Sequence, residues 1–341
     1  MSIKRQLSSA EITAAFKPRL EFPKYNVTLA NFHGHHRVAL QKMRSLAPQV
    51  NLVVEIRDSR APISTRNGLF VRVMGDIPRL ILYSKRDLSS LKQETIQKWH
   101  PDGNALSVDC NSYSDVRKVL RIAKSMHAST TPAPPLGSHL LVTGMPNVGK
   151  STFLNTLRTA GTSIKKKAAP TGGMAGVTRS ISNEIKISSN PPIYIFDTPG
   201  VFVPHVKDER TMIALAVTGA MRTSIVEPEI QADYLLYRLN LAHPDGKPYR
   251  SFLPHPTNNI EELLEAIWKQ KLKPKQRGGG YNPTGAAAFW VDQYRQGRAG
   301  KVSLDDLNEF ESASAIEEKL LDDFEMDFDE EARRWKQPFL F

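Results

Sequence analysis

A glycine-rich loop between an apolar run and a helical pattern places the strongest limit on the fold of this chain. It lies in the stretch LLVTGMPNVGKSTFLNTL at residues 140–157 and has the spacing Gly144-x-x-x-x-Gly149-Lys150-Ser151. In such a loop, consecutive backbone N–H groups converge on phosphate groups, assisted by the positive end of the following helix. A strand, this loop and a helix in series predict an α/β domain that binds a nucleotide.

Two side chains of the loop have defined tasks in a site of this kind. The Lys150 ammonium is expected to reach the β- and γ-phosphates, and the Ser151 hydroxyl is expected to bind Mg²⁺. Further nucleotide contacts are expected from Asn147, Val148, Gly149 and Thr152. The loop predicts a nucleotide without indicating which base it carries.

A second phosphate-sensing stretch, IFDTPGV at residues 195–201, follows a predicted strand. Asp197 is placed to hold Mg²⁺ through water, and the Gly200 N–H is placed to sense the γ-phosphate. Between the two stretches, GMAGVTRS offers Thr178 in a glycine-rich segment. A threonine there completes the Mg²⁺ shell only while the γ-phosphate is present, which predicts a nucleotide-dependent switch.

Apolar runs and helical patterns alternate over residues 31–205. The expected strands are 51–58, 79–87, 105–110, 139–144, 182–188 and 192–197, and the expected helices are 90–99, 114–127 and 150–159. A proline-rich connector at 129–137 can be neither helix nor central strand. This alternation predicts a doubly wound, mostly parallel sheet covered on both faces.

After residue 205 the pattern becomes helical. One apolar stripe in NNIEELLEAIW contains Ile260, Leu263, Leu264, Ile267 and Trp268, and weaker helical patterns cover 209–222, 227–240 and 283–296. The chain is therefore expected to divide into an N-terminal extension (1–30), an α/β domain (31–205), a small all-helical domain (206–301) and an acidic tail (302–341).

The net charge of +11 is unevenly distributed along the 341 residues. Residues 302–341 hold 13 acidic and 4 basic side chains, so the remainder carries +20. The strong positive charge of residues 1–301 favours a polyanionic partner, and nucleic acid is the first candidate. The alternative is that the charge serves only solubility. Cations of the helical domain that are expected to follow an RNA backbone are Lys271, Lys273, Lys275, Arg277, Arg295, Arg298 and Lys301.

The first 30 residues are rich in basic side chains and carry only Glu11 and Glu21 as acids. This composition is compatible with a mitochondrial presequence and equally with a plain disordered extension. No apolar run approaches the ~20 residues that span a bilayer, so any membrane association is expected to be peripheral. The single cysteine, Cys110, excludes an intramolecular disulfide and fits a reducing compartment.

A guanine-reading motif stands ahead of the phosphate loop rather than behind it. The stretch LILYSKRDL at 80–88 carries Ser84-Lys85-Arg86-Asp87 at the end of an apolar run. The Asp87 carboxylate can accept hydrogen bonds from guanine N1–H and N2–H₂, which adenine cannot supply, and Lys85 can lie over the base. The next stretch, SVDCNS, is placed to offer a backbone N–H near Cys110 to guanine O6.

This order of motifs resembles the circularly permuted GTPases of the YlqF/YawG family. NFHGHH followed by ALQKM is similar to the family box W-F-P-G-H-M-x-K-A, and EIRDSRAPISTRN at 55–67 is similar to D-A-R-x-P-x-S-S-R-N. LAVTGAM at 215–221 and YRQGRAGK at 294–301 resemble its C-terminal domain. The resemblance implies a circularly permuted G domain over 31–205, whose former ends are joined by the proline-rich connector.

Within the family, the chain resembles the mitochondrial members that assist assembly of the large ribosomal subunit. The resemblance implies hydrolysis of GTP to GDP with Mg²⁺, slow alone and stimulated by the ribosomal particle. The implied partners are the large-subunit precursor and its rRNA. The resemblance implies a monomer in the mitochondrial matrix. Any contact with the inner membrane would be peripheral.

Catalysis needs a residue that orients the attacking water. The position where many GTPases have a glutamine is occupied by Val201, which cannot do so. By resemblance, His35 takes this role. The other expected catalytic residues are Lys150, Thr178 and Gly200, with the tasks given above. Asn147 matches an asparagine that helps bind K⁺ in several cation-dependent GTPases, and such a cation would supply positive charge in the transition state.

Three positions depart from the family pattern. Ser84 replaces an asparagine, which removes an amide that contacts guanine N7 and braces the phosphate loop, so weaker nucleotide affinity is expected. His36 replaces a methionine, and AGVT replaces PGVT. Two alternatives stay open: a large-subunit assembly GTPase of a bacterial, cytosolic or nucleolar compartment, and a P-loop ATPase or small-molecule kinase.

Overall fold

The computed structural model describes residues 16–162, 184–221, 224–272 and 280–311. Six strands form one sheet in the order β3-β2-β1-β4-β6-β5, parallel except for the antiparallel pair β5 and β6. Their bounds are β1 Leu52–Asp58, β2 Arg79–Ser84, β3 Ala105–Ser107, β4 Ser138–Gly144, β5 Ile185–Ser189 and β6 Pro192–Asp197. The expected mostly parallel, doubly wound sheet is confirmed.

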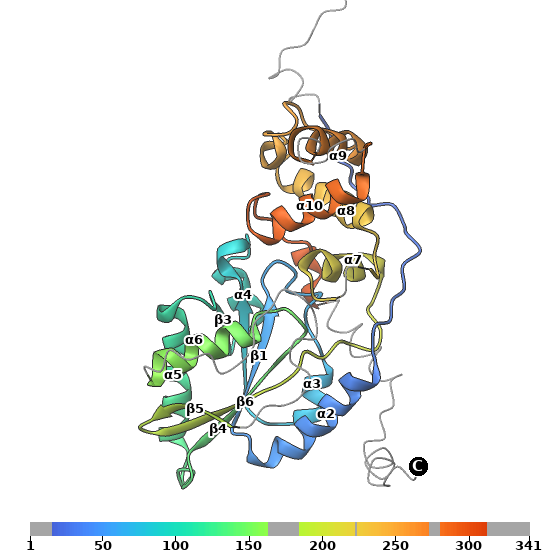
Figure 1. Ribbon diagram of the computed structural model, residues 1–341. Helices are drawn as coiled ribbons and strands as arrows, with labels where there is room; N and C mark the ends of the chain where they lie inside the picture. Colours follow the sequence, from blue (N-terminus) through green and yellow to red (C-terminus); the bar gives the residue numbers. More distant parts are fainter. Residues whose placement is uncertain (1–15, 163–183, 222–223, 273–279, 312–341) are drawn as a thin grey trace, which may run out of the picture.

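Side chains of the central strands alternate between two apolar layers, as strand geometry requires. On β1, Val53 packs in the layer formed by α2 (Gly34–Leu46) and α3 (Leu69–Met74). Its neighbours Val54 and Ile56 pack in the layer of α5 (Tyr113–Ser129) and α6 (Lys150–Thr162). At the β3 edge, α4 (Gln93–Trp99) covers Ile81 and Tyr83 of β2. The sheet is therefore covered on both faces (Figure 1).

Two helices on this domain were not expected. Helix α2 begins within the family box and buries His36, Ala39, Leu40 and Met43, at a helical spacing that the sequence already contained. Helix α3 has only six residues, which is too short for a periodic pattern. Both helices lie on the same face of the sheet (Figure 1).

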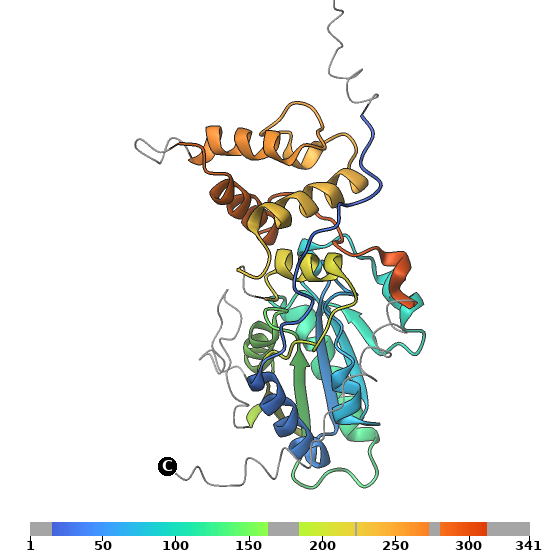
Figure 2. The same cartoon turned by 90° about the vertical axis from the view of Figure 1, so that its right-hand side faces the viewer.

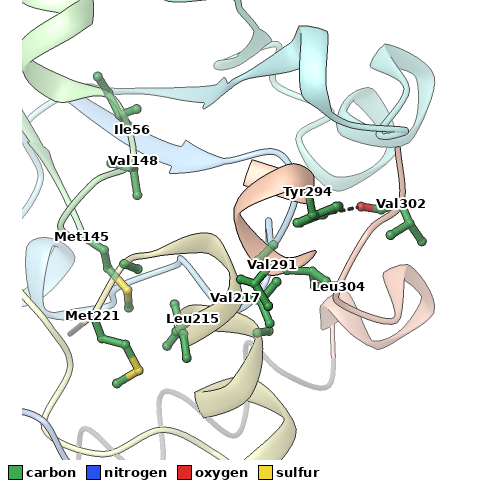
Figure 3. Packing of buried hydrophobic residues seen from close by; sticks show 14 of the residues in the cluster. Ile56, Met145, Val148, Leu215, Val217, Met221, Val291, Tyr294, Val302 and Leu304 are labelled. Atoms are coloured by element: carbon green, nitrogen blue, oxygen red, sulfur yellow. Dashed lines mark hydrogen bonds between the residues drawn. The ribbon is translucent and has the colours of Figure 1, made fainter. Parts of the chain in front are cut away.

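The second domain is helical, as expected. It contains α7 (Glu209–Thr218), α8 (Pro228–Ala242), α9 (Ile260–Ile267) and α10 (Pro283–Arg295), and a π-helical turn, Trp268–Leu272, follows α9. The domain sits at the carboxyl ends of the parallel strands (Figure 1). One apolar cluster runs through both domains, and Figure 3 shows Met145 near Leu215 and Met221. The two domains therefore share a core.

The N-terminal strap, defined as residues 16–33, lies folded along both domains (Figure 2). The Arg19 guanidinium binds the Asp233 carboxylate of α8 through both of its terminal nitrogens, at 2.6 and 3.2 Å. Phe22 is buried against Tyr234 and Tyr237 of α8. Described residues of the expected extension thus belong to the folded body rather than to a free segment.

The C-terminal belt, defined as residues 302–311, likewise differs from the expected acidic tail. Leu304 is fully buried in the shared core. The Asp305 carboxylate accepts hydrogen bonds from the backbone N–H groups of Ile63 and Ser64, at 2.7 and 2.9 Å. Phe310 stacks on Trp99, with ring centroids 4.3 Å apart. The belt therefore returns from the helical domain to the edge of the sheet.

No helix within the described parts of the chain has the length and apolar character needed to cross a membrane.

Candidate guanine-nucleotide site

The carboxyl ends of β2, β4 and β6 bring three sequence motifs to one edge of the sheet. The guanine motif follows β2, the phosphate loop follows β4, and the Asp-x-x-Gly stretch follows β6. Ligands of open α/β sheets bind outside the carboxyl ends of the strands. The permuted order along the chain therefore still assembles one site in space.

Close packing around the phosphate loop requires its glycines. Gly144 has a φ of +146°, and a Cβ atom there would lie 2.3 Å from the Ile56 carbonyl oxygen of β1. Gly149 has a φ of +106°, where L-residues are strained. Gly200 of the Asp-x-x-Gly stretch lies against Pro146, since a Cβ atom there would be 2.6 Å from the proline nitrogen. The Asp-x-x-Gly stretch thus touches the phosphate loop directly.

The Lys150 ammonium is buried and turned back onto the loop. Its Nζ donates hydrogen bonds to the carbonyls of Met145 and Gly144, at 2.7 and 3.1 Å. Burial lowers the pKa of Lys150 to about 8, although the nearby Asp197 carboxylate opposes this shift. A bound phosphate would offer the ammonium a stronger partner than these carbonyls.

Asp197 has the features of a metal-binding carboxylate. Its side chain is buried, and its Oδ1 atom has no hydrogen-bond partner among the described residues. Burial raises the pKa of Asp197, and Lys150 opposes the shift. Ser151 lies half-buried at the start of α6. A buried oxygen without a partner, together with a loop hydroxyl, fits Mg²⁺, which prefers oxygen ligands.

Lys85 connects the guanine motif to the phosphate loop. Its backbone is left-handed, with a φ of +55°. Its Nζ donates to the Asn147 carbonyl at 2.8 Å and forms an ion pair with Asp58 at 2.7 Å. The base-reading and phosphate-reading motifs are therefore already joined in the protein itself.

The structure corrects one expected consequence of Ser84, the loss of the brace to the phosphate loop. The Ser84 Oγ lies 2.5 Å from the Val148 carbonyl oxygen and 3.0 Å from that of Arg57. Its single proton is donated to one of these at a time. The hydroxyl reaches Val148 because Ser84 is wholly buried beneath the loop. The brace to the phosphate loop is thus kept, and weaker nucleotide affinity stays a prediction.

Asp87 is exposed, as base recognition requires, whereas Cys110 is buried beneath it. The Cys110 Sγ lies 3.5 Å from the position of a Cβ on Gly149, so SVDCNS adjoins the phosphate loop. Burial raises the pKa of Cys110 to about 12, so its thiol stays protonated. An Arg86–Asp115 ion pair of 2.9 Å ties the guanine motif to the start of α5.

His35 lies in the first turn of α2 rather than in a loop, and its side chain is exposed. Its ring centroid is 4.0 Å from that of His36. Burial lowers the pKa of His36 to about 4, while a hydrogen bond to the Gly200 carbonyl opposes the shift. His36, which sequence reasoning treated only as a replacement for methionine, thus joins His35 to the Asp-x-x-Gly stretch.

Val201 is fully buried, in agreement with its exclusion as a water-orienting residue. Its carbonyl accepts a hydrogen bond of 2.9 Å from the Asn67 amide. Asn67 belongs to the EIRDSRAPISTRN stretch. That stretch therefore holds the backbone that follows Gly200.

Asn147 has a left-handed backbone, with a φ of +56°. Its Nδ2 donates to the Gly219 carbonyl, at the end of α7, at 2.7 Å. The phosphate loop is thus hydrogen-bonded to the helical domain. K⁺ binding by Asn147 stays a prediction.

The expected RNA-contacting cations divide into three groups. Lys271, Arg298 and Lys301 are exposed. Arg295 is not placed for RNA, because it donates to the carbonyls of Ala216 and Val217 at the end of α7, at 2.7 and 2.8 Å. The remaining three cations lie outside the described residues: Lys273, Lys275 and Arg277. Thr178, the expected switch threonine, also lies outside them.

Comparisons with known proteins identify relatives of this chain. The family described as 50S ribosome-binding GTPase matches residues 139–271. Mitochondrial GTPase 1 of Saccharomyces cerevisiae is 37% identical over 83% of this chain and 82% of its own length. The mitochondrial ribosome-associated GTPase 1 of Ictalurus punctatus is 35% identical over 80% of this chain and 91% of its own length. A crystal structure of GNP-bound YlqF from T. maritima covers 78% of this chain at 21% identity, with a TM-score of 0.49.

These relatives extend over both domains, since Mitochondrial GTPase 1 of Aedes aegypti also covers 84% of the chain at 32% identity and 97% of its own length. The chain carries a guanine motif ahead of a phosphate loop, and the sheet reunites the two. The chain therefore belongs to the mitochondrial GTPase 1 family, with the motif order of a circularly permuted GTPase.

Proposed function

We propose that this mitochondrial GTPase is an assembly factor for the large subunit of the mitochondrial ribosome, and that its nucleotide state controls binding to the particle. One observation carries the proposal: the phosphate loop is hydrogen-bonded to the helical domain through Asn147 and the Gly219 carbonyl. A change at the phosphates can therefore reach the surface that would meet RNA. The names of the ribosome-associated relatives support the choice of partner.

For hydrolysis, we assign each group the following task. Lys150 would leave its carbonyl partners for the β- and γ-phosphates, and the Gly200 N–H would sense the γ-phosphate. Ser151, Asp197 and Thr178 would hold Mg²⁺, which neutralises charge on the phosphate oxygens when bound. His35 would orient the attacking water, because Val201 is buried and apolar. The contact of the His35 ring with the His36 ring, and the contact of His36 with Gly200, support this role.

Intrinsic turnover is expected to be slow and stimulated by the ribosomal particle. His35 is exposed in the described structure, so its placement over a nucleotide would depend on a partner or on the switch. K⁺ near Asn147 would add positive charge in the transition state. Na⁺ is the matched control for this cation, and equal rates in the two salts would remove K⁺ from the proposal.

The partner would be rRNA in the large-subunit precursor, met by the exposed cations Lys271, Arg298 and Lys301 together with the basic residues at 273–277. We place the protein in the matrix, with any contact to the inner membrane peripheral, and as a monomer. A cleaved presequence would end before Arg19, because removing Arg19 would leave the buried Asp233 carboxylate without its guanidinium partner.

A tagged Thr178→Ala protein, expected to stall with GTP bound, tests the function when its associated RNA is sequenced. A tagged Thr130→Ala protein, altered in the proline-rich connector, is the control. Enrichment of mitochondrial large-subunit rRNA over the control is the expected result. Enrichment of cytosolic large-subunit rRNA would overturn the mitochondrial pathway, and the absence of any rRNA would overturn the assembly role. Adenine selectivity in purified protein would favour an ATPase or kinase instead.

A further inference from the structure

A buried carboxylate at the end of β1 joins three parts of the molecule. The Asp58 side chain is 2% exposed. Its Oδ2 accepts hydrogen bonds from the Lys85 ammonium at 2.7 Å and from Arg60 at 2.8 Å, and its Oδ1 accepts a second hydrogen bond from Arg60 at 3.0 Å. The two cations hold the pKa of Asp58 well below its usual range despite burial. Asp58 therefore stays ionised between two cations.

Arg60 extends this group into the helical domain. Its side chain is 2% exposed, and its Nη2 also donates to the Thr218 carbonyl of α7 at 3.2 Å. Its guanidinium carbon lies 5.7 Å from the centroid of the Tyr294 ring of α10. The Arg60 carbonyl accepts the Leu304 N–H of the C-terminal belt at 2.8 Å. Arg60 is thus fixed by α7, α10 and the belt.

Lys85 carries the same connection towards the nucleotide. Its ammonium bridges Asp58 and the Asn147 carbonyl of the phosphate loop. Because two partners hold the ammonium, the four-carbon side chain of Lys85 keeps one conformation across the base side of the site. Without Asp58, the ammonium would keep only one carbonyl partner, and the flexible stem would regain rotamer freedom.

We propose that Asp58 and Arg60 form a positioning unit for Lys85 of the guanine motif, and that Arg60 ties this unit to the helical domain at Thr218. Neither residue would touch the nucleotide itself. The unit would set affinity for GTP and GDP alike, because both share the guanine base. This inference rests on guanine-nucleotide binding and is independent of the proposed ribosomal partner.

A double-mutant cycle on purified protein tests the unit, with the affinity for a fluorescent N-methylanthraniloyl-GDP as the readout. Asp58→Asn and Lys85→Met are each expected to weaken binding about tenfold. The double variant is expected to bind no more weakly than the single variant with the lower affinity. A merely structural role of Asp58 would give additive losses, which would overturn the proposal. KM for GTP should rise by the same factor as the dissociation constant, with kcat unchanged, because the contact is equal in ground and transition states.

The same strand offers a matched control. Glu55 and Arg57 form a second buried ion pair of 2.6 Å on β1, with side chains 1% and 5% exposed. Glu55 contacts neither Lys85 nor the helical domain through any hydrogen bond or ion pair of the described residues. Glu55→Gln is expected to lower thermal stability while leaving nucleotide affinity unchanged. A loss of affinity equal to that of Asp58→Asn would overturn the proposal.

Arg60→Lys keeps the test decisive if Asp58→Asn does not fold, since that variant leaves a buried guanidinium without its carboxylate. Lysine retains the charge but lacks the planar fork that reaches both Asp58 oxygens and Thr218 together. We expect a severalfold loss of N-methylanthraniloyl-GDP affinity, and wild-type affinity would overturn the proposal. A wild-type protein that binds GDP but captures no rRNA would refute the assembly function while leaving this inference standing.

Discussion

The base side and the phosphate side of the nucleotide site are prepared to different degrees. On the base side, Lys85 has the partners Asp58 and Asn147, and Ser84 reaches the Val148 carbonyl. On the phosphate side, the described structure leaves Asp197 Oδ1 without a hydrogen-bond partner. Lys150 there is hydrogen-bonded to carbonyls of its own loop.

This contrast separates affinity for the base from the structural response to phosphate and Mg²⁺. A prearranged base side loses little freedom on binding guanine, so its contacts appear as affinity. A phosphate side that contains a turned-back lysine and a carboxylate oxygen without a partner must rearrange when phosphate and Mg²⁺ arrive. Under the proposed function, the base side would select the nucleotide and the phosphate side would respond to the number of phosphates.

The largest effect is expected from removing the cation of the phosphate side. Lys150→Ala should lower GTP hydrolysis by on the order of 1,000-fold, because transition-state charge loses its main protein donor. Phosphate release under single-turnover conditions measures this loss. Lys118→Ala, at an exposed side chain, is the control. A loss of less than tenfold would contradict the assigned role of Lys150.

On the base side, Asp87→Asn should weaken GDP binding by on the order of 100-fold, since two charge-assisted hydrogen bonds to guanine are lost. The same variant should gain affinity for xanthosine diphosphate, whose O2 replaces the guanine amino group. Competition binding with the two diphosphates measures the exchange. If the preference for guanine persisted in this variant, the guanine motif would have to lie elsewhere.

A smaller loss is expected where the two sides meet. Ser84→Ala should weaken GDP binding roughly fivefold, because a buried hydrogen bond to the phosphate loop contributes about 1 kcal/mol. The exposed Ser90→Ala is the control, and titration calorimetry measures both. Unchanged affinity in Ser84→Ala would mean that the brace does not position the loop.

An effect of similar size, spread over one pH unit, is expected from a proton linkage on the phosphate side. The pKa of Lys150 is lowered to about 8 by burial, and arriving phosphates should raise it. Between pH 8 and 9 the complex then holds more protons than the free protein, so GDP affinity should fall up to about fivefold. Calorimetry at pH 8.5 in buffers of different ionisation enthalpy should detect proton uptake. Lys150→Arg should take up none, and the same uptake in that variant would assign the proton elsewhere.

The sequence predicted the parts of this molecule that depend on local patterns. The strand ends at Asp58, Gly144 and Asp197 could be placed, because each follows an apolar run and precedes a recognisable loop. The strand expected over 79–87 ends earlier, at Ser84, because Lys85 has a left-handed backbone and a 3-10 turn follows it. The resemblance to circularly permuted GTPases also implied that the permuted motifs would meet in one sheet. These features rest on strand geometry and on backbone demands that only certain residues meet.

What the sequence did not predict depends on long-range contacts. The strap at Arg19 and the belt at Asp305 are extended segments without periodicity, and their partners lie more than 200 positions away. Arg295 was predicted to be a surface cation. Its partners are backbone carbonyls of α7, which every residue type has, so the sequence does not indicate them. The contact between His36 and Gly200 could not be predicted either, since it depends on where α2 packs.

The C-terminal belt also determines when the site can be complete during synthesis. The base-reading strands leave the ribosome first, the phosphate loop next, and Asp305 only near the end of the chain, yet Asp305 holds Ser64, six residues after Asp58. Contacts across such separations form late, because the loop between them must first close. A nascent chain would thus carry both nucleotide motifs before the loop beside Asp58 is held in place by Asp305.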